Sequence, residues 1–423
     1  MTRRGDRARE PMPPTPAPIL ASDSPPRLRD AARPSRLALP ATPFTSLVRR
    51  RAEWQRRIAM VRCAREFLYT SSYFYHYDRY GREYAGELIA AARRGVDTWL
   101  IIDGFGQRIA RALMSTAEWQ RLGALFTTLR AAGVHLVLYR APTRLQRLMG
   151  GGLHIKVQVS EAGETILSSG NISATSFARW NEYAVALRGP IAAQLLDLLM
   201  AFIERPVRSH LTRLRARAYP AAGPPPSPTT YCVAGHPAAD PSPLSPIVQA
   251  RPNPVTRELV RLIDAAQRTL RITSFYFKPV PELFDALERA ARRGVQVEIY
   301  HSHRDALPES VAPWLAATFY YRRCLDLGIR VFENLRGEHS KIVVADERWA
   351  AVGTYNLEHA AHDRLAEVMV ITDEPAIVAE LVAVVEGLAA DPANRPVDRT
   401  LLPSLPLALK VKRLAVYPVR RWV

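Results

Sequence analysis

The chain has 423 residues, of which 58 are Lys or Arg and 40 are Asp or Glu, so its formal net charge is +18. This length accommodates two or three domains, and the charge favours an anionic partner: nucleic acid, an anionic membrane surface or a phosphorylated substrate. The three cysteines, Cys63, Cys232 and Cys324, lie far apart without a Cys-x-x-Cys spacing. They argue against a disulfide framework or a thiolate zinc site, and they favour a reducing, cytosolic setting.

Neither a secretory signal nor a membrane span is predicted. The N-terminal arginines are followed by no apolar core. The most apolar long stretch, residues 183–203, is interrupted by Arg188, Gly189, Pro190 and Asp197. A spanning helix needs about 20 predominantly apolar residues. If a membrane is involved, we expect the protein to lie on it.

Proline content divides the chain. Residues 1–43 hold ten of the 34 prolines and residues 220–254 hold eleven, and both segments lack hydrophobic periodicity. The predicted organisation is a proline-rich, disordered N-terminal segment (1–44), a first domain (45–216), a proline-rich linker (217–251), a second domain (252–395) and a basic, apolar C-terminal tail (396–423).

Both predicted domains begin with the same succession of elements. In the first, residues 67–75 predict a buried strand, and residues 88–103 predict an amphipathic helix that ends at a glycine and leads into a second strand. Residues 269–277 and 286–301 repeat this succession in the second domain. Strand–helix–strand is typical of a right-handed crossover in a largely parallel or mixed sheet, so we expect a duplicated α/β fold.

Farther along, five polar positions recur at a constant separation of 185 residues. The pairs are His154 and His339, Lys156 and Lys341, Glu161 and Asp346, Asn171 and Asn356, and Glu182 and Glu367. One His-x-Lys is explained as an accident of the surface, but five matched positions without slippage favour duplication of a half-site.

The local patterns "HIKVQV" and "HSKIVV" predict strands, which would place each His and its Lys on one face. An imidazole beside an ammonium needs an anion, and a phosphodiester between two such strands supplies one. Asn171 and Asn356 lie on small-residue turns and can donate to its non-bridging oxygens.

The two imidazoles suit complementary tasks. One attacks phosphorus to form a covalent phosphohistidine, and the other protonates the departing alkoxide and then deprotonates the incoming nucleophile. Glu182 and Glu367 could each hold the second ring nitrogen of a histidine. The lysines supply positive charge, so no metal is required. The remaining close histidine pairs, His301 with His303 and His359 with His362, favour ordinary core or solvated roles over metal binding.

"HSKIVVADERWAAVGTYN" and "HIKVQVSEAGETILSSGN" resemble the His-x-Lys-x(4)-Asp motif and following Asn turn of the phospholipase D superfamily, the second with Glu161 in place of Asp. The resemblance covers both predicted domains. It implies a duplicated phospholipase D-like fold with one active site at a pseudo-twofold interface and phosphohistidine chemistry without a metal or other cofactor. It also favours His154 as the nucleophile.

Within this superfamily the chain looks most like bacterial cardiolipin synthases and related phosphatidyltransferases, because it carries two motifs and the segment "GTYNLEHAAHDRLAE". It departs from them where "EHAA" replaces the usual Asp-x-Arg-Ser run. The resemblance implies a phospholipid substrate, plausibly phosphatidylglycerol. The alternatives are a hydrolase acting on phospholipid, a nuclease, and an inactive scaffold or nucleic-acid-binding module. Two motifs on one chain favour lipid over nucleic acid, and the retained polar set argues against an inactive scaffold.

Two segments are candidates for contact with the inner face of the cell membrane. The tail "LALKVKRLAVYPVRRWV" (407–423) mixes cations, apolar residues and Trp422. The segment "PTRLQRLMGGG" (142–152) precedes His154 and could form a lipid-facing lid. A docked tail or edge strand and a plain solvated loop are the respective alternatives. Glu161 and Asp346, at the ends of their strands, are expected to anchor a turn or pair with a cation.

Overall fold

The computed structural model describes residues 44–218, 230–236, 253–307 and 310–423, which all belong to one unit, Pro34–Val423. The predicted N-terminal segment lies almost entirely outside the described residues, as does most of the predicted linker. We refer to residues 44–218 as the first half and to residues 253–423 as the second half.

The first half forms a seven-stranded sheet in the order β1-β8-β7-β6-β2-β3-β4. Strand β2 pairs in parallel with β3, and β3 with β4, while β6, β7 and β8 are antiparallel to their neighbours. Its elements are β1 (Phe44–Ser46), α1 (Arg50–Cys63), β2 (Phe67–Ser72), α2 (Arg79–Arg93), β3 (Asp97–Asp103), α3 (Gly104–Arg111), α4 (Thr116–Ala131), β4 (His135–Tyr139), α5 (Arg144–Leu148), β5 (Gly152–Leu153), β6 (Val157–Ser160), β7 (Glu164–Ser168), α6 (Ala174–Ala178), β8 (Ala184–Arg188), α7 (Pro190–Met200) and α8 (Arg208–Ala218).

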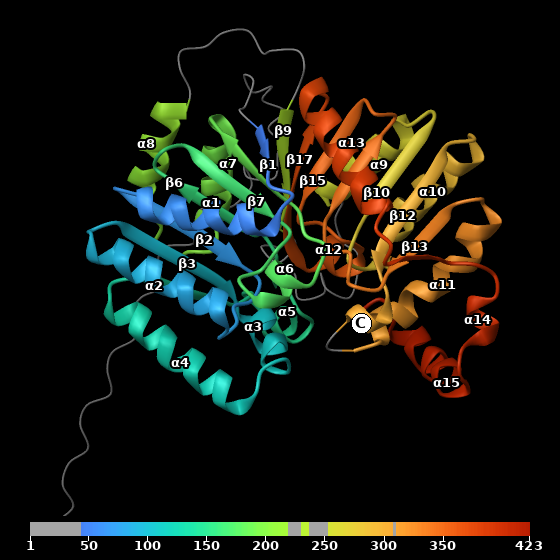
Figure 1. The fold of residues 1–423 in the computed structure, drawn as a ribbon, viewed down its shortest axis with the longest axis horizontal. Coiled ribbons are helices and arrows are strands. Elements are labelled where there is room, and N and C mark those ends of the chain that lie inside the picture. The colour runs from blue at the N-terminus through green and yellow to red at the C-terminus, as the bar shows by residue number, and fades with distance from the viewer. Residues whose placement is uncertain (1–43, 219–229, 237–252, 308–309) are drawn as a thin grey trace, which may run out of the picture. The chain divides into compact units, whose positions relative to one another are not determined.

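The second half repeats this arrangement. Strand β10 pairs in parallel with β12, and antiparallel with β14, as β2 does with β3 and β6. The remaining elements are β9 (Thr230–Gly235), α9 (Pro254–Ala265), β10 (Thr269–Thr273), β11 (Phe277–Lys278), α10 (Pro281–Arg292), β12 (Gln296–Ser302), the 3-10 helix η2 (Arg304–Ala306), α11 (Ala312–Asp326), β13 (Arg330–Asn334), β14 (Ile342–Ala345), β15 (Trp349–Gly353), β16 (Leu357–Glu358), α12 (His359–Asp363), β17 (Leu365–Thr372), α13 (Pro375–Ala389), β18 (Asn394–Pro396), α14 (Leu401–Ser404), α15 (Leu407–Val416) and the 3-10 helix η3 (Tyr417–Val419). The predicted duplicated α/β fold is confirmed (Figure 1).

Strand β17 joins the two halves. It belongs to the nine-stranded sheet of the second half, yet it also pairs in parallel with β5, which precedes His154. It pairs antiparallel with β9 as well. Strand β9 lies inside the segment predicted to be a linker, and that prediction is wrong there: "TYCVAG" offers β-branched and aromatic residues to an open sheet edge despite the prolines around it.

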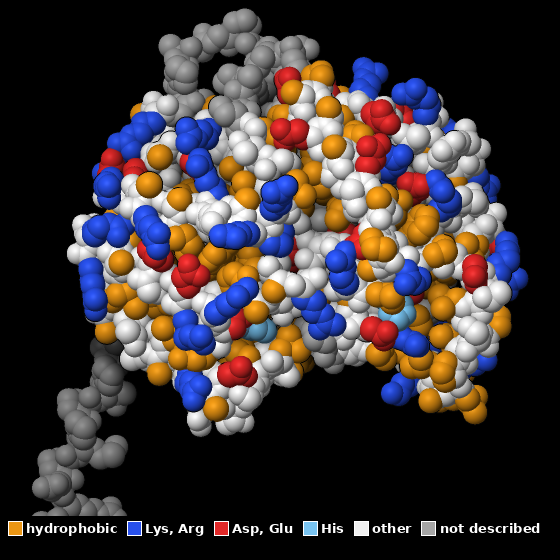
Figure 2. All heavy atoms as spheres, viewed as in Figure 1, with side chains coloured by type: hydrophobic (Ala, Val, Ile, Leu, Met, Phe, Trp, Pro, Cys, Tyr) orange, Lys and Arg blue, Asp and Glu red, His pale blue; other side chains and the backbone are white. Residues whose placement is uncertain are grey.

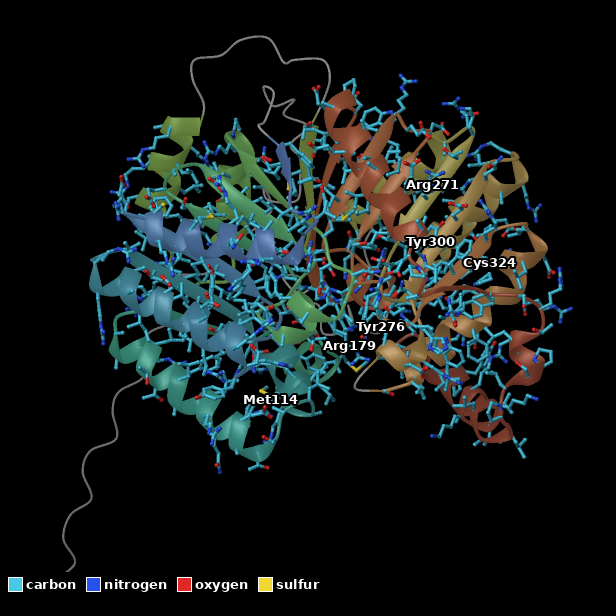
Figure 3. All side chains as sticks on the ribbon, viewed as in Figure 1. Met114, Arg179, Arg271, Tyr276, Tyr300 and Cys324 are labelled. Carbon is cyan, nitrogen blue, oxygen red and sulfur yellow. The ribbon has the colours of Figure 1, made fainter. Side chains whose placement is uncertain are left out.

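The main core is shared between the halves. Apolar side chains of β6, including Val157 and Val159, pack in one cluster with Ile342 and Val344 of β14 and with Val368 of β17. Polar contacts add to this interface: the guanidinium of Arg179, labelled in Figure 3, donates to the carbonyl of Asp305 (2.9 Å). The packed interface fixes the positions of the residues that end each half's strands.

The C-terminal tail is helical. Helix α15 packs on α11, where Arg413 donates to Thr318 Oγ1 (2.7 Å) and lies over the ring of Phe319. Its opposite face is exposed, with Leu407, Val411 and Leu414 between 58% and 76% accessible. Residues 407–416 therefore form a docked helix and not an edge strand.

Within the described ranges, no helix has both the length and the apolar character needed to cross a bilayer.

Candidate active site

Each histidine lies just before a strand rather than on it. Strand β6 begins at Val157 and β14 at Ile342, so the prediction that His and Lys share a strand face is wrong. The lysine instead turns back on the histidine: Lys156 Nζ donates to the carbonyl of His154 (2.8 Å), and Lys341 Nζ to that of His339 (2.5 Å). The expected proximity of His and Lys is thus met by a local loop.

The histidines are held across the two halves. His154 Nδ1 lies 2.8 Å from Glu367 Oε1, and His339 Nδ1 lies 2.8 Å from Glu182 Oε2. The glutamate that supports each ring therefore comes from the other half.

The backbone follows the same crossed pattern. The His154 N–H donates to the carbonyl of Ala366 (3.0 Å), one residue before Glu367. The His339 N–H donates to the carbonyl of Asn181 (2.8 Å), one residue before Glu182. Each ring and its backbone are therefore fixed by one segment of the opposite half.

A hydroxyl orients each glutamate. Ser169 Oγ donates to Glu182 Oε2 and Thr354 Oγ1 to Glu367 Oε2, each at 2.5 Å. When it is ionised, each carboxylate only accepts hydrogen bonds, so it then requires a hydrogen on Nδ1 and leaves the lone pair on Nε2 of the ring. This is the tautomer that a nucleophile or general base needs.

The site is buried and rich in cations. His154 and His339 are 5% and 4% exposed, and both lysines are 1% exposed. Burial lowers the pKa of Lys156 to about 7 and that of Lys341 to about 8. Burial also lowers the pKa of His339 to about 4 and that of His154 well below its usual range, with the neighbouring lysines adding to the effect. Two neutral imidazoles between two lysines form a site that an anion would stabilise.

The two glutamates make matching hydrogen bonds, but their pKa values are shifted in opposite directions. Burial raises the pKa of Glu367 to about 8 against the opposing effect of Lys156. Burial acts on Glu182 too, but His339 and Lys341 outweigh it and lower the pKa of Glu182 to about 2. Burial therefore favours the neutral form of Glu367, whereas the neighbouring cations favour the ionised form of Glu182.

The asparagines lie where the repeat predicts, at the ends of the turns after β7 and β15. Asn171 Oδ1 accepts from the backbone N–H of Tyr73 (3.1 Å), and Asn356 Oδ1 from that of Phe275 (3.2 Å). This fixes each amide with Nδ2 as the donor end. Asn356 Nδ2 donates to Glu358 Oε1 (3.2 Å).

Glu161 and Asp346 anchor turns, as predicted. Glu161 Oε1 accepts from the backbone N–H of Arg65 (2.8 Å), just before β2. Asp346 accepts from the backbone N–H groups of Gln267, Arg268 and Thr269, at the start of β10. Both carboxylates tie the motif strand to its neighbour.

The aromatic neighbours of the histidines were not predicted. Trp180 stacks on His339 with a centroid separation of 4.8 Å, and Phe275 meets the same ring edge-on at 4.5 Å. Gly337 permits this contact: its φ is +108°, and a Cβ there would lie 2.4 Å from the Trp180 ring. Tyr73 meets His154 edge-on at 4.9 Å. Aromatic residues at the strand ends, in "SSYFY" and "TSFYF", were the available signal.

Asp103 was also missed. Its side chain caps α3 and accepts from the backbone N–H of Leu153 (2.8 Å), the residue before His154. Burial raises the pKa of Asp103 to about 7. An acidic residue at the end of a predicted strand and before a glycine signals a helix N-cap, but its contact with Leu153 requires the tertiary structure.

The other histidine pairs form no recognisable ligand set. His301 Nε2 bonds the hydroxyl of Tyr321 (2.9 Å), and His362 Nδ1 bonds that of Thr256 (2.7 Å). Across the part of the chain that the structure describes, no group of three or more His, Cys, Asp or Glu side chains is arranged to hold a metal ion.

Known proteins of similar sequence are named as cardiolipin synthases. The family described as "Cardiolipin synthase, PLD-like domain" matches residues 259–388. Cardiolipin synthase B of Shigella flexneri is 25% identical over 354 residues, covering 80% of this chain and 78% of that protein. Cardiolipin synthase A of Pseudomonas aeruginosa (strain LESB58) is 33% identical over 158 residues, covering 37% and 32%.

Solved structures show the same fold. The phosphatidylserine synthase of Haemophilus influenzae Rd KW20 superposes with a TM-score of 0.70 at 15% identity, covering 90% of this chain and 95% of that one. The polyphosphate kinase of Porphyromonas gingivalis gives a TM-score of 0.51 at 12% identity, covering 83% and 51%. With its paired His-x-Lys motifs, duplicated fold and relatives named as cardiolipin synthases, the chain is similar to enzymes of the phospholipase D superfamily.

Proposed function

We propose that this chain is a phosphatidyltransferase of the cardiolipin synthase type, which moves a phosphatidyl group from one phospholipid to the hydroxyl of another. The observation that carries the proposal is the crossed pair of His–Glu contacts, which prepares two imidazoles for acid–base and nucleophilic work beside two buried lysines. The cardiolipin synthase B relatives, similar over most of the chain, support phospholipid as the substrate.

The reaction proceeds in two displacements. One imidazole Nε2 attacks phosphorus while the other imidazole, protonated, gives its proton to the departing alcohol oxygen as the P–O bond breaks. The phosphatidyl group is then bonded to nitrogen. The hydroxyl of the acceptor lipid attacks phosphorus, its proton passes to the second imidazole, and the P–N bond breaks to restore the first ring.

The lysines and asparagines act on charge. In this proposal Lys156 and Lys341 hold the non-bridging oxygens, and the phosphodiester anion raises their lowered pKa values on binding. In this proposal the Nδ2 groups of Asn171 and Asn356 act as additional donors. The lysines supply the positive charge that the transition state needs, so no metal takes part in the proposed chemistry.

The nucleophile is either His154 or His339. The superfamily resemblance favours His154. Rapid quenching with a radiolabelled donor lipid, followed by peptide mapping at alkaline pH, identifies the phosphorylated ring.

We further propose that the protein works in the cytoplasm, peripheral to the inner face of the cell membrane. The exposed apolar stripe of α15, formed by Leu407, Val411 and Leu414, supports this. Lysines at 410 and 412 accompany the stripe, as is typical of helices that lie in an anionic interface.

Product analysis tests the proposal. Purified protein is incubated with phosphatidylglycerol vesicles, and the lipids are measured by mass spectrometry. We expect cardiolipin from the unmodified protein, and loss of turnover in His154→Ala and in His339→Ala with circular dichroism retained. Phosphatidic acid as the only product indicates a hydrolase, and DNA cleavage without lipid turnover indicates a nuclease. Full activity of either variant refutes the shared site.

A further inference from the structure

Arg364 is a buried cation that makes no direct ion pair with a carboxylate of the described residues. It is 5% exposed, and its guanidinium donates only to backbone carbonyls, from Nη1 to Met149 (3.2 Å) and from Nη2 to Arg421 (3.3 Å). Its buried Nε has no hydrogen-bond partner, and within the described ranges no carboxylate forms an ion pair with it. Buried charges in proteins are normally paired, so this guanidinium is arranged for an anion that the chain itself does not supply.

The surroundings of Arg364 carry further positive charge. Lys278 pairs with Glu358 (3.0 Å) and also donates to the backbone oxygen of Val423, and Arg421 pairs with Asp363 (2.9 Å). Glu358 and Asp363 act on Arg364 only at longer range, because each of them pairs directly with one of these other cations, and burial lowers the pKa of Arg364.

The pKa of His359 is affected by the same cations. Burial lowers its pKa to about 3, and the cations Arg421, Lys278 and Arg364 add to this effect. We call Lys278, His359, Arg364 and Arg421 the arginine cluster.

The arginine cluster adjoins the catalytic residues by two routes. Glu358, the partner of Lys278, also accepts from Asn356 Nδ2 (3.2 Å). The carbonyl of Arg364 accepts from the N–H of Gly152 (3.1 Å), at the start of the strand pair that positions His154. An anion at Arg364 would therefore lie next to, and separate from, a phosphodiester at the histidines.

We propose that the arginine cluster binds the phosphate of the acceptor phospholipid. This inference rests on the proposed transferase function. In phosphatidylglycerol the attacking hydroxyl is joined to the lipid's own phosphate by a three-carbon glycerol unit. When that hydroxyl reaches phosphorus at the histidines, its phosphate must rest close by, where Arg364 offers a planar fork of donors.

In the proposed complex, the acceptor phosphate takes the place of the present hydrogen-bond partners of Arg364. Met149 belongs to the segment between α5 and β5, and Arg421 follows η3 in the C-terminal tail. The carbonyl oxygens of both residues accept from the guanidinium, and these are the contacts that phosphate oxygens replace. The two segments that the sequence marks as lipid-facing candidates thus meet over one arginine.

Arg364→Met separates acceptor binding from the rest of the reaction. In phosphatidylglycerol vesicles, loss of a charge-assisted contact should reduce the ratio of cardiolipin to phosphatidic acid by about tenfold or more, since water needs no phosphate site. The matched control is Arg399→Met, which removes an exposed arginine paired with Asp326 and should leave the ratio as in the unmodified protein. An unchanged ratio in Arg364→Met, or equal loss of both products, overturns the inference.

A binding measurement does not depend on turnover. The probe is a water-soluble, short-chain phosphatidylglycerol, and the readout is the rise in melting temperature. Without the probe, Arg364→Met should melt no lower than the unmodified protein, because it removes an unpaired buried charge. With the probe, it should lose part of the rise. If the unmodified protein forms no cardiolipin but Arg364→Met still loses the rise, the transferase proposal fails and the anion site stands. A full rise in the variant overturns the site itself.

Discussion

At the scale of single residues, the reactive geometry depends on glutamates that touch no substrate in the proposed mechanism. Glu182 and Glu367 act through the rings that they orient, so the proposed chemistry assigns them positioning roles. The hydroxyls of Ser169 and Thr354 hold each carboxylate in turn. Catalysis should therefore be sensitive to small changes at these buried positions.

Glu182→Gln and Glu367→Gln should each lower kcat by on the order of 10²-fold, because an amide can present its N–H to Nδ1 and stabilise the wrong ring tautomer. KM should change much less. The measurement is steady-state lipid turnover across pH, where both variants should also shift the pH profile. Glu386→Gln, which alters an exposed glutamate on α13, is the control. A loss confined to KM would contradict the positioning role.

Lys341→Met should make the protein more stable at pH 7 while it removes activity. Burial lowers the pKa of Lys341 to about 8, so the folded protein disfavours its charge at pH 7, and an apolar side chain of similar length removes that cost. The unfolded chain keeps the proton of Lys341 up to about pH 10.5, whereas the folded protein releases it above about pH 8. Between these values the unfolded state binds more protons, so the stability contributed by this position rises with pH.

The difference in unfolding free energy between the variant and the unmodified protein should consequently shrink from pH 8 to pH 10.5, as measured by urea denaturation. Lys410→Met, at an exposed position on α15, should show no such trend. A difference that stays constant with pH would mean that burial does not lower the pKa of Lys341.

At the scale of elements, α15 presents two different faces. Leu409, Arg413 and Val416 face the protein, and Leu409 and Val416 pack against the cluster that contains Trp180 and Phe275, the two rings beside His339. Leu407, Val411 and Leu414 face away from it. In Figure 2 hydrophobic side chains gather over this helix at the lower right. The helix thus connects an exposed apolar stripe to the surroundings of a catalytic ring.

Replacing Leu407, Val411 and Leu414 together by serine should weaken binding to anionic vesicles, because each side chain buries apolar area in the interface. Vesicle sedimentation measures the effect, and turnover of a soluble short-chain substrate should stay near that of the unmodified protein. Val48→Ser, at an exposed apolar residue of the first half, is the matched control. Unchanged sedimentation of the triple variant would exclude α15 as the membrane contact.

The elements also show what sequence can and cannot predict here. The constant separation of 185 residues identifies the eight catalytic candidates and the duplicated fold, because residue identities repeat. It does not tell which glutamate supports which histidine, because each glutamate follows the histidine of its own half by the same 28 residues (182 − 154 and 367 − 339), and this repeat is also compatible with pairs inside each half. The partner of β9 and the contact between Asp103 and Leu153 likewise depend on segments far apart in the chain.

At the scale of the whole molecule, the net charge of +18 acts at longer range than any single contact. Lys and Arg side chains are distributed over the face shown in Figure 2, on both halves of the described chain. Such a distribution attracts an anionic surface without defining a site.

Vesicle binding should therefore fall steeply as salt rises from 0.05 to about 0.5 M, because the Debye length shortens over this range. The measurement is sedimentation with vesicles of constant anionic lipid content. Vesicles of neutral lipid alone should bind weakly at every salt concentration. Salt-independent binding would assign the affinity to apolar contacts alone.

The crossed His–Glu pairs constrain how such a protein can be recombined with its relatives. A chimera that takes one half from a related protein inherits a histidine whose supporting glutamate, if paired as here, stays behind in the other parent. The activity of the chimera then depends on whether the two parents bring the histidine and the glutamate within hydrogen-bond distance. A histidine should therefore be exchanged together with the segment of the other half that carries its glutamate. A cut between the two halves separates that histidine from that segment.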